Sequence, residues 1–372
     1  MTITSDTTLT EDHYGSIVIA ADDVTLDCAG FSLIGPSPDP WPVDGVLVDQ
    51  HSNVTIKDCI AIGFVNGFKL QGVTDSTLIG NTATTNEGNG FYASDGSGSN
   101  VFRENISFDN VVGHGFAFEF ASNGNLVRDS IAYGNGGNGV QVYRARGNEF
   151  RGNVVHDNGA GGFGLDRTHG GRLVENLARE NAGAGFTLSN SRGNRLVENV
   201  ARGNGDVGLS GFDSSHMILR GNSALGNGYD GFSFGRASQN VLTDNTARAN
   251  VKNGFTIATS SGNVLRGNQS SHNDGKGFFI NTRSNDNVFR LNEANANGQT
   301  GFGTEHRSDA NLFVRNRAMA NSEWGFDLLF GSSHNTLTRN VACHNHFVDG
   351  YDDGSGVANV WRANTFCTSE IP

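Results

Sequence analysis

Three side chains that can exchange protons recur at a fixed spacing in the middle of the chain. Glu119, Tyr143 and Asp166 lie 24 and 23 residues apart, and His169 follows three residues after Asp166. Carboxyl, phenol and imidazole groups are the usual general acids and bases of enzymes. We therefore predict these four as catalytic residues. Tyr143 and His169 are expected to act as base and acid, Asp166 to orient them, and Glu119 to supply a second carboxyl group.

Arginines crowd around the same positions. Guanidinium groups hold carboxylates through two parallel hydrogen bonds, so this composition favours a ligand that carries carboxylates, such as a uronate sugar. The alternative is a solvated charge cluster whose ion pairs contribute little. The predicted substrate-binding residues are Arg144, Arg146, Arg167, Arg192, Asp213, Arg236 and Trp41.

A repeat of 23 or 24 residues must position these side chains. Its consensus is N-x-[LF]-x-x-N-x-A-x-x-N-x-x-x-G-F-x-[LIF], and Ser130 replaces the middle asparagine once. Apolar residues two apart indicate short strands. Asparagine and glycine indicate corners, because both tolerate positive φ. The middle asparagine recurs at Asn81, Asn105, Asn153, Asn176, Asn199, Asn222, Asn245, Asn268, Asn292, Asn316, Asn340 and Asn364.

This period predicts an all-β fold, a single-stranded right-handed parallel β-helix of about 14–15 coils with 23–24 residues per coil. Equivalent residues of successive coils then stack about 4.8 Å apart. The phenylalanine of each Gly-Phe pair and the second residue after it are expected inside. The first and third residues after it are expected outside. Glu119, Tyr143 and Asp166 all take the third position, so they share one outward column.

The repeat defines the domain organisation. Residues 1–21 are predicted to be an N-terminal cap and residues 22–372 the β-helix domain, with a proline-rich insertion at 35–44 that carries Trp41. The C-terminal coil is lengthened at 343–358. Its acidic residues Asp349, Asp352 and Asp353 are weak calcium candidates, and a polar end cap is the alternative. Otherwise no cofactor is expected to be required.

A second group of polar and aromatic side chains lies later in the chain. Glu305, His306 and Arg307 are followed one coil on by Glu323, Trp324 and Asp327. The group contains an acid, a histidine and an aromatic residue, although fewer coils contribute to it than to the first site.

The four cysteines form two pairs. Cys28 and Cys59 share one column of neighbouring coils, and Cys343 and Cys367 are one coil apart. Stacking brings each pair within disulfide range. Disulfides near both ends favour an oxidising compartment, whereas reduced thiols in a cytosolic protein are the alternative.

Composition excludes several classes of protein. A hydrophobic share of 36% with 25 Phe excludes a disordered chain. The net charge of −12 disfavours a nucleic-acid partner. The sequence has no run of 18 apolar residues, so no membrane span is predicted. The first residues lack the basic start and apolar stretch of a signal peptide, so a cytoplasmic location stays open. A monomer or small homo-oligomer is expected.

The sequence resembles the pectate-lyase-like β-helix superfamily, in particular repeat proteins of the NosD and carbohydrate-binding or sugar-hydrolase type. The repeat itself and the opening Ile17-Val-Ile-Ala-Ala-Asp-Asp-Val-Thr-Leu-Asp-Cys28 carry the likeness. This resemblance implies the same fold over nearly the whole chain, and it favours a secreted or periplasmic location.

One segment is similar to the Tyr-Gly-Phe-Asp-Pro-His signature of mannuronan epimerases. It reads Gly162-Phe163-Gly164-Leu165-Asp166-Arg167-Thr168-His169. Asp166 matches directly and His169 matches after a one-residue insertion, whereas Arg167 replaces the proline and Phe163 the tyrosine. Tyr143 on the neighbouring coil would substitute in space. The resemblance implies proton transfer at carbon five of a uronic acid.

Two functions follow as hypotheses. The first is an enzyme that acts on an acidic polysaccharide or oligosaccharide by proton abstraction, as an epimerase or a lyase. Hydrolysis is a variant, because Glu119 and Asp166 fall two coils apart, roughly 9.5 Å, near the upper limit for an inverting pair. The second is a non-catalytic β-helix that binds glycans or assists a partner, as NosD-like proteins do.

Overall fold

The computed structural model describes residues 1–35 and 43–371. These described residues form strands, turns and bends and contain no helix. The chain divides into an N-terminal unit of residues 1–183 and a C-terminal unit of residues 184–372.

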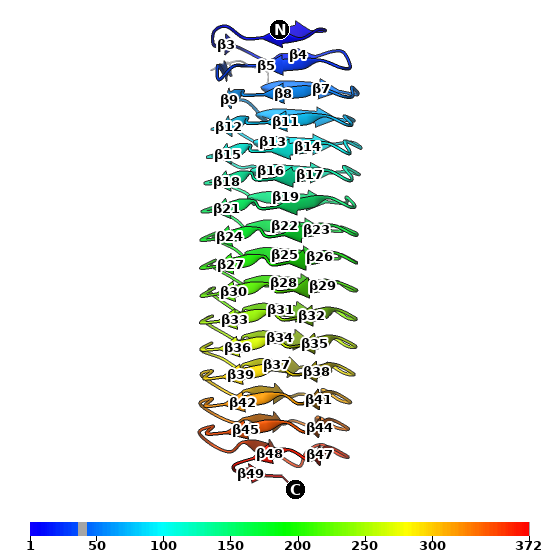
Figure 1. Ribbon diagram of the computed structural model, residues 1–372, viewed down its shortest axis with the longest axis vertical. Helices are drawn as coiled ribbons and strands as arrows, with labels where there is room; N and C mark the ends of the chain where they lie inside the picture. Colours follow the sequence, from blue (N-terminus) through cyan, green and yellow to red (C-terminus); the bar gives the residue numbers. More distant parts are fainter. Residues whose placement is uncertain (36–42, 372) are drawn as a thin grey trace. The chain divides into compact units, whose positions relative to one another are not determined.

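In the N-terminal unit, each turn of the chain contributes one short strand to each of three parallel sheets, A, B and C (Figure 1). Sheet A contains β1 (Thr2–Ile3), β4 (Ile17–Ile19), β7 (Val46–Asp49), β10 (Phe68–Gln71), β13 (Phe91–Ser94), β16 (Phe116–Glu119), β19 (Val140–Tyr143) and β22 (Phe163–Asp166). Sheet B contains β2 (Thr7–Thr8), β5 (Thr25–Asp27), β8 (Thr55–Lys57), β11 (Thr77–Ile79), β14 (Val101–Arg103), β17 (Leu126–Arg128), β20 (Glu149–Arg151) and β23 (Arg172–Val174). Sheet C contains β3 (His13–Tyr14), β6 (Ser32–Ile34), β9 (Ile60–Ile62), β12 (Thr82–Thr84), β15 (Ile106–Phe108), β18 (Ile131–Tyr133), β21 (Val154–His156) and β24 (Leu177–Arg179).

The C-terminal unit repeats this arrangement. Its sheet A contains β25 (Phe186–Ser189), β28 (Leu209–Phe212), β31 (Phe232–Gly235), β34 (Phe255–Ala258), β37 (Phe278–Asn281), β40 (Phe302–Thr304), β43 (Phe326–Leu328), β46 (Gly350–Asp352) and β49 (Ser369–Glu370). Its sheet B contains β26 (Arg195–Val197), β29 (Ile218–Arg220), β32 (Val241–Thr243), β35 (Val264–Arg266), β38 (Val288–Arg290), β41 (Leu312–Val314), β44 (Thr336–Thr338) and β47 (Val360–Arg362). Its sheet C contains β27 (Val200–Arg202), β30 (Ser223–Leu225), β33 (Thr246–Arg248), β36 (Gln269–Ser271), β39 (Glu293–Asn295), β42 (Arg317–Met319), β45 (Val341–Cys343) and β48 (Thr365–Phe366).

These sheets confirm the predicted right-handed parallel β-helix. Sheets B and C each have 16 strands, so the described chain makes about 16 turns, more than the repeat count predicted. The extra turn comes from residues 1–21, which lack the repeat consensus. Their strands β1, β2 and β3 pair with β4, β5 and β6.

The phenylalanine column fills the core as expected. In the N-terminal unit Phe68, Phe91 and Phe116 stack with ring centroids 4.8 and 4.7 Å apart. In the C-terminal unit the stack from Phe232 to Phe255 has a spacing of 4.6 Å. Each of these rings is at most 1% exposed. Full burial of a phenylalanine stabilises a fold by about 1.5–3 kcal/mol, which makes this column a main source of stability.

The asparagines form ladders along the core. Asn245, which is fully buried, donates from Nδ2 to the side-chain oxygen of Asn268 at 2.9 Å and to the carbonyl of Leu219 at 3.1 Å. Its own side-chain oxygen accepts from the backbone amide of Asn222 at 2.9 Å. Buried amides pay a desolvation cost unless they are hydrogen-bonded, and the ladder satisfies each one from its neighbours.

The corners confirm positive φ for some glycines but not for the ladder asparagines. At the corner between sheets B and C, the left-handed residue is the one before the ladder asparagine, which is a glycine at Gly267 (φ 66°) and an aspartate at Asp244 (φ 55°). The glycine of the Gly-Phe pair is required by space instead. A Cβ on Gly254 would lie 2.8 Å from the carbonyl oxygen of Gly277 in the next turn, so any side chain there would clash with backbone.

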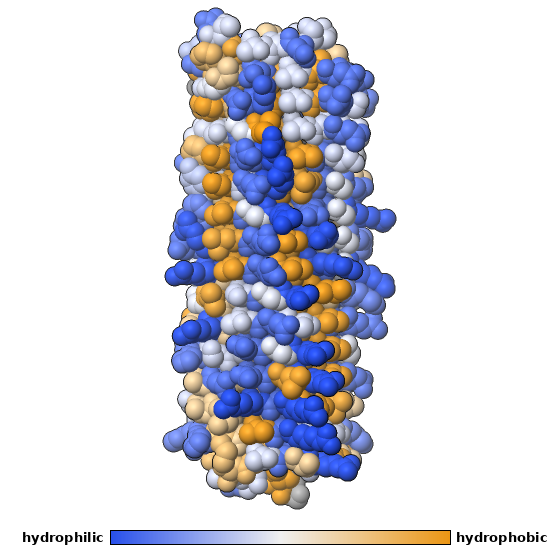
Figure 2. All heavy atoms as spheres, in the orientation of Figure 1, coloured by the Kyte–Doolittle hydropathy of each residue, from blue (hydrophilic) through white to orange (hydrophobic). Residues whose placement is uncertain are grey.

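The outer surface alternates in columns. Figure 2 shows hydrophilic residues over most of the drawn face, with apolar residues in rows between them. In the C-terminal unit, the first residues of successive sheet B strands remain partly exposed, as at Ile218, Val241 and Val264. The outward positions therefore carry apolar as well as polar columns.

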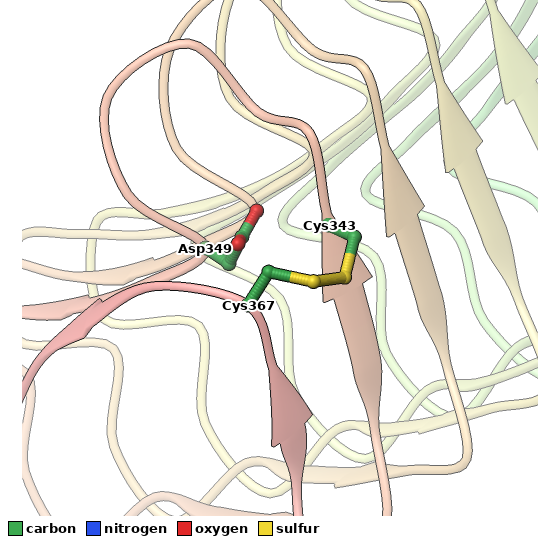
Figure 3. A group of neighbouring side chains, drawn as sticks. All are labelled: Cys343, Asp349 and Cys367. Carbon is green, nitrogen blue, oxygen red and sulfur yellow. A yellow bond between two sulfur atoms is a disulfide. The ribbon is translucent and has the colours of Figure 1, made fainter.

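Both cysteine pairs are disulfides. Cys28 and Cys59 are joined in the N-terminal unit with Cα atoms 4.7 Å apart. Cys343 and Cys367 are joined in the C-terminal unit with Cα atoms 5.1 Å apart, beside Asp349 (Figure 3). The predicted disulfides are therefore confirmed, and the alternative of reduced thiols is wrong.

Candidate functional site

The predicted outward column exists in the N-terminal unit. Glu119, Tyr143 and Asp166 end the neighbouring strands β16, β19 and β22 and face one another in register. All three side chains are half-buried. Adjacent strands of a sheet lie about 4.8 Å apart, so one sugar residue can contact more than one of these groups.

Tyr143 is surrounded by cationic and aromatic groups. Arg167 donates from Nη1 to the phenol oxygen at 2.8 Å. The guanidinium carbons of Arg144 and Arg167 lie 5.0 and 5.6 Å from the ring centroid, and Phe120 packs edge-on at 5.8 Å. The oxygen that would hold negative charge after losing a proton thus faces a guanidinium group.

The backbone explains why the arginines lie there. Arg144 and Arg167 directly follow β19 and β22, and both adopt the left-handed conformation, with φ of 51° and 54°. At this conformation the chain turns the corner after the strand while both side chains stay exposed on the outer surface. The corner thus places the two cations beside the strand ends.

Tyr92 is a member of the site that the sequence interpretation missed. It lies on the outward face of β13, and its hydroxyl donates to Glu119 Oε2 at 3.3 Å. Burial, together with the Glu119 charge, raises the pKa of Tyr92 to about 12. Burial also raises the pKa of Glu119, opposed by the hydrogen bond from Tyr92. The feature of the sequence that could have revealed Tyr92 is an aromatic residue at the first outward position, one coil before Glu119.

His169 and Arg146 lie one turn apart beyond the strand ends. Their backbones form an isolated parallel bridge, and both side chains are exposed. Among the described residues no hydrogen bond joins His169 to Tyr143. The predicted base and acid are thus near the same corner without a hydrogen bond between them.

Three further predicted binding residues belong to the C-terminal unit. Arg192 bridges Ser215 through its backbone. Asp213 accepts two hydrogen bonds from Arg236, both 2.7 Å long, which lower the pKa of the carboxyl group. Arg236 also lies 4.1 Å above the ring of Phe212. Trp41 lies outside the described residues.

The second predicted cluster, also in the C-terminal unit, contains a lysine that the sequence interpretation missed. Lys276 forms ion pairs with Glu305 and, at 3.7 Å, with Asp327. Asp327 accepts from the Thr304 amide and from the Thr300 hydroxyl, each at 3.0 Å. The feature of the sequence that could have revealed this arrangement is the glycine at position 303. A Cβ there would lie 2.9 Å from Lys276 Nζ, so only glycine leaves room for the lysine.

Burial alters the ionisation of this cluster. It raises the pKa of Asp327 to about 6, opposed by the positive charge of Lys276. For Lys276, burial alone would lower the pKa, but the charges of Asp327 and Glu305 raise it overall. The network therefore holds an ammonium group tightly and one carboxyl group that titrates near neutral pH.

Replacing Asp327 with asparagine is expected to change how stability depends on pH. Between 3.8 and about 6 the folded protein binds more protons at Asp327 than the unfolded chain does, so this group lowers the free energy of unfolding as pH rises. Relative to that of the wild type, the free energy of unfolding of Asp327→Asn should therefore rise by up to about 3 kcal/mol between pH 4 and pH 7. Urea unfolding at both pH values measures this difference.

Asp213→Asn is the matched control. Arg236 lowers the pKa of Asp213, so losing this carboxyl group removes a contribution whose pH dependence has the opposite sign. The raised pKa of Asp327 would be contradicted if the free energy of unfolding of Asp327→Asn did not rise relative to the wild type between the two pH values. It would also be contradicted if Asp213→Asn showed the same rise.

The three calcium candidates have hydrogen-bond partners within the protein. Asp349 accepts from Asn345 Nδ2 at 2.6 Å and from the Thr368 amide at 2.9 Å, which ends the asparagine ladder. Asp352 accepts from Asn359 and Trp361, and Asp353 accepts from Phe330 and Ser355. These contacts are those of an end cap, and calcium binding stays a prediction.

The chain belongs to the family described as the right handed beta helix region, whose model matches residues 3–155, 123–225, 144–263 and 202–342. Among solved structures it is similar to the A-modules of the Azotobacter vinelandii mannuronan C-5 epimerases AlgE6 and AlgE4. Each has a TM-score of 0.50 and 16% identity, with coverage of 96% and 97% of this chain and 91% of each module.

It is also similar to PfbA, a surface adhesin of Streptococcus pneumoniae, with a TM-score of 0.54 and 10% identity over 75% of this chain and 82% of that one. At these identities the likenesses show the fold. No curated protein matches the sequence. Within the described residues, no helix has the length and apolarity needed to cross a membrane.

Proposed function

We propose that this protein is a carbohydrate-active β-helix that acts on an acidic glycan by proton transfer at the column of Glu119, Tyr143 and Asp166. The observation that carries the proposal is the environment of Tyr143, whose hydroxyl accepts a hydrogen bond from Arg167 and whose ring lies beside Arg144. The two disulfides favour an oxidising compartment, outside the cytoplasm, where such glycans occur.

The chemistry begins with the proton on the carbon next to the uronate carboxylate. Arg144 and Arg167 bind the carboxylate and stabilise the negative charge that develops on it when that proton leaves. Tyr143 is the base that takes the proton. Return of a proton to the opposite face inverts the carbon, whereas loss of the neighbouring glycosidic oxygen produces a double bond. Glu119 or His169 donates the proton that either product requires.

Two further observations support this placement. The segment Gly162–His169, which is similar to the epimerase signature, contains Asp166, Arg167 and His169 of the site. The mannuronan epimerase modules that share the fold are named for inversion at carbon five of a uronate.

The test is a panel of polymannuronate, polygalacturonate and glucuronan. Unsaturated-product absorbance reports elimination, exchange of the carbon-five proton in deuterated water reports epimerisation, and new reducing ends report hydrolysis. We expect one signal, weakened at least tenfold in Arg144→Ala and Arg167→Ala. Arg103→Ala, on sheet B of the same unit, should leave it unchanged. Absence of all three signals would count against the enzyme.

A non-catalytic glycan-binding protein is the second candidate, favoured by the lack of a direct hydrogen bond between Tyr143 and His169. In that case the same arginine variants should weaken binding of oligouronates in calorimetry, while no product forms with the wild type. Turnover together with binding would exclude it.

A further inference from the structure

The outward face of sheet A in the C-terminal unit carries a second built surface. From β37 to β46 its first outward column consists of Phe279, Gly303, Asp327 and Tyr351, which are neighbours in register. Gly303 leaves a space above the sheet that Lys276 and Asp327 enter from the two sides. This missing side chain makes the surface different from the neighbouring turns.

Polar groups are fixed around this space. Glu305 is 8% exposed and is held between Lys276 and His306, with His306 Nδ1 at 3.6 Å from Glu305 Oε2. The Thr300 hydroxyl contacts both Asp327 and Glu323. One ammonium group thus faces three acidic side chains, so the network has an excess of negative charge near neutral pH.

Aromatic rings flank the network on both sides. Before the strand, Trp324 stacks on Tyr351 at 5.4 Å and contacts Phe347 at 5.1 Å, and Phe347 is 51% exposed. After the strand, Phe330 is 56% exposed and stacks on His306 at 4.8 Å. Trp324 and Phe330 thus lie before and after the strand β43 (Phe326–Leu328).

We propose that this face is a second glycan-binding site, which takes an uncharged oligosaccharide that lies along the strand β43 from Trp324 to Phe330. The apolar faces of sugar rings pack on exposed aromatic side chains, and carboxylates accept hydrogen bonds from sugar hydroxyls. Glu305 is the acceptor held in place for this purpose, because Lys276 and His306 fix it from two sides.

The charge of the network selects the class of ligand. Negative charges in a surface of low dielectric constant repel a uronate, whereas they accept hydrogen bonds from neutral hydroxyls. The proposal therefore differs from the arginine-rich column of the N-terminal unit, and it does not depend on that column being catalytic.

The test is isothermal titration calorimetry of the full chain with hexasaccharides of β-1,4-glucose, α-1,3-glucose, β-1,4-xylose, N-acetylglucosamine and mannuronate. We expect at least one neutral hexasaccharide to bind. Phe330→Ala should weaken it at least fivefold, and Glu305→Gln and Trp324→Ala at least tenfold. Tyr229→Ala is the matched control, because Tyr229 is 48% exposed in the same unit and lies outside this face. It should change affinity by less than twofold.

Thermal unfolding of every variant separates lost binding from lost folding, and the exposed Phe330 is the variant least able to disturb the fold. The proposal is overturned if no neutral hexasaccharide binds, or if Phe330→Ala binds as well as the wild type. Binding of a neutral hexasaccharide that is lost in Phe330→Ala but kept in Arg167→Ala would support the second site, even if the arginine-rich column proves inactive.

Discussion

Replacing Tyr143 with phenylalanine is expected to lower turnover of the acidic glycan by 10²–10⁴-fold, because the variant keeps the ring and loses only the group that moves the proton. The hydroxyl bonds an exposed arginine, so its removal should cost the fold about 1 kcal/mol or less. Initial rates on the substrate found in the panel measure the effect. Circular dichroism and thermal unfolding confirm that the β-helix is intact.

Tyr229→Phe serves as the control, since this exposed phenol lies in the C-terminal unit. Its turnover should equal that of the wild type. A rate for Tyr143→Phe within a factor of two of the wild type would remove Tyr143 from the proton-transfer step. A change in KM alone, with kcat unaltered, would assign it to binding.

The register of the repeat predicted most of what the structure shows at the first site. A period near one coil brings equivalent residues into neighbouring strands, so the pairing of Glu119 with Tyr143 and of Tyr143 with Asp166 in adjacent strands follows from spacing alone. The position of Arg167 beside Tyr143 follows as well, because it occupies the next column of the adjoining turn.

What sequence reasoning missed are contacts that cross both columns and turns. Tyr92 reaches Glu119 from the first outward position of one turn to the third position of the next. Lys276 reaches Asp327 across an intervening turn because Gly303 leaves room. Such contacts depend on side-chain length and on local space, which a column-by-column reading leaves out.

The direction of long side chains limited the prediction for the arginines too. Arg236 shares a column with Arg167, yet it bonds Asp213 and covers Phe212. The residue at the same position of the previous turn decides which partner each arginine takes. That residue is Asp213 for Arg236 and Arg144 for Arg167. Column membership alone therefore predicts exposure but not the partner.

The asparagine ladder provides the second large effect. Asn245→Ala is expected to lower the free energy of unfolding by about 2 kcal/mol or more, since it leaves the backbone amide of Asn222 buried without its acceptor and removes the Nδ2 donor to the Leu219 carbonyl. Urea unfolding measures the loss. Asn295→Ala, at an outward position of sheet C, is the control and should cost less than about 1 kcal/mol.

The chain itself indicates how much of that loss a shorter side chain can restore. Ser130 occupies the ladder column, where its hydroxyl accepts from the Asn105 amide at 3.2 Å. Asn245→Ser should therefore lie between alanine and the wild type in stability, because it restores an acceptor for Asn222 but no amide donor for Leu219. Equal stability of the serine and alanine variants would show that filling space, and not hydrogen bonding, is what the column supplies.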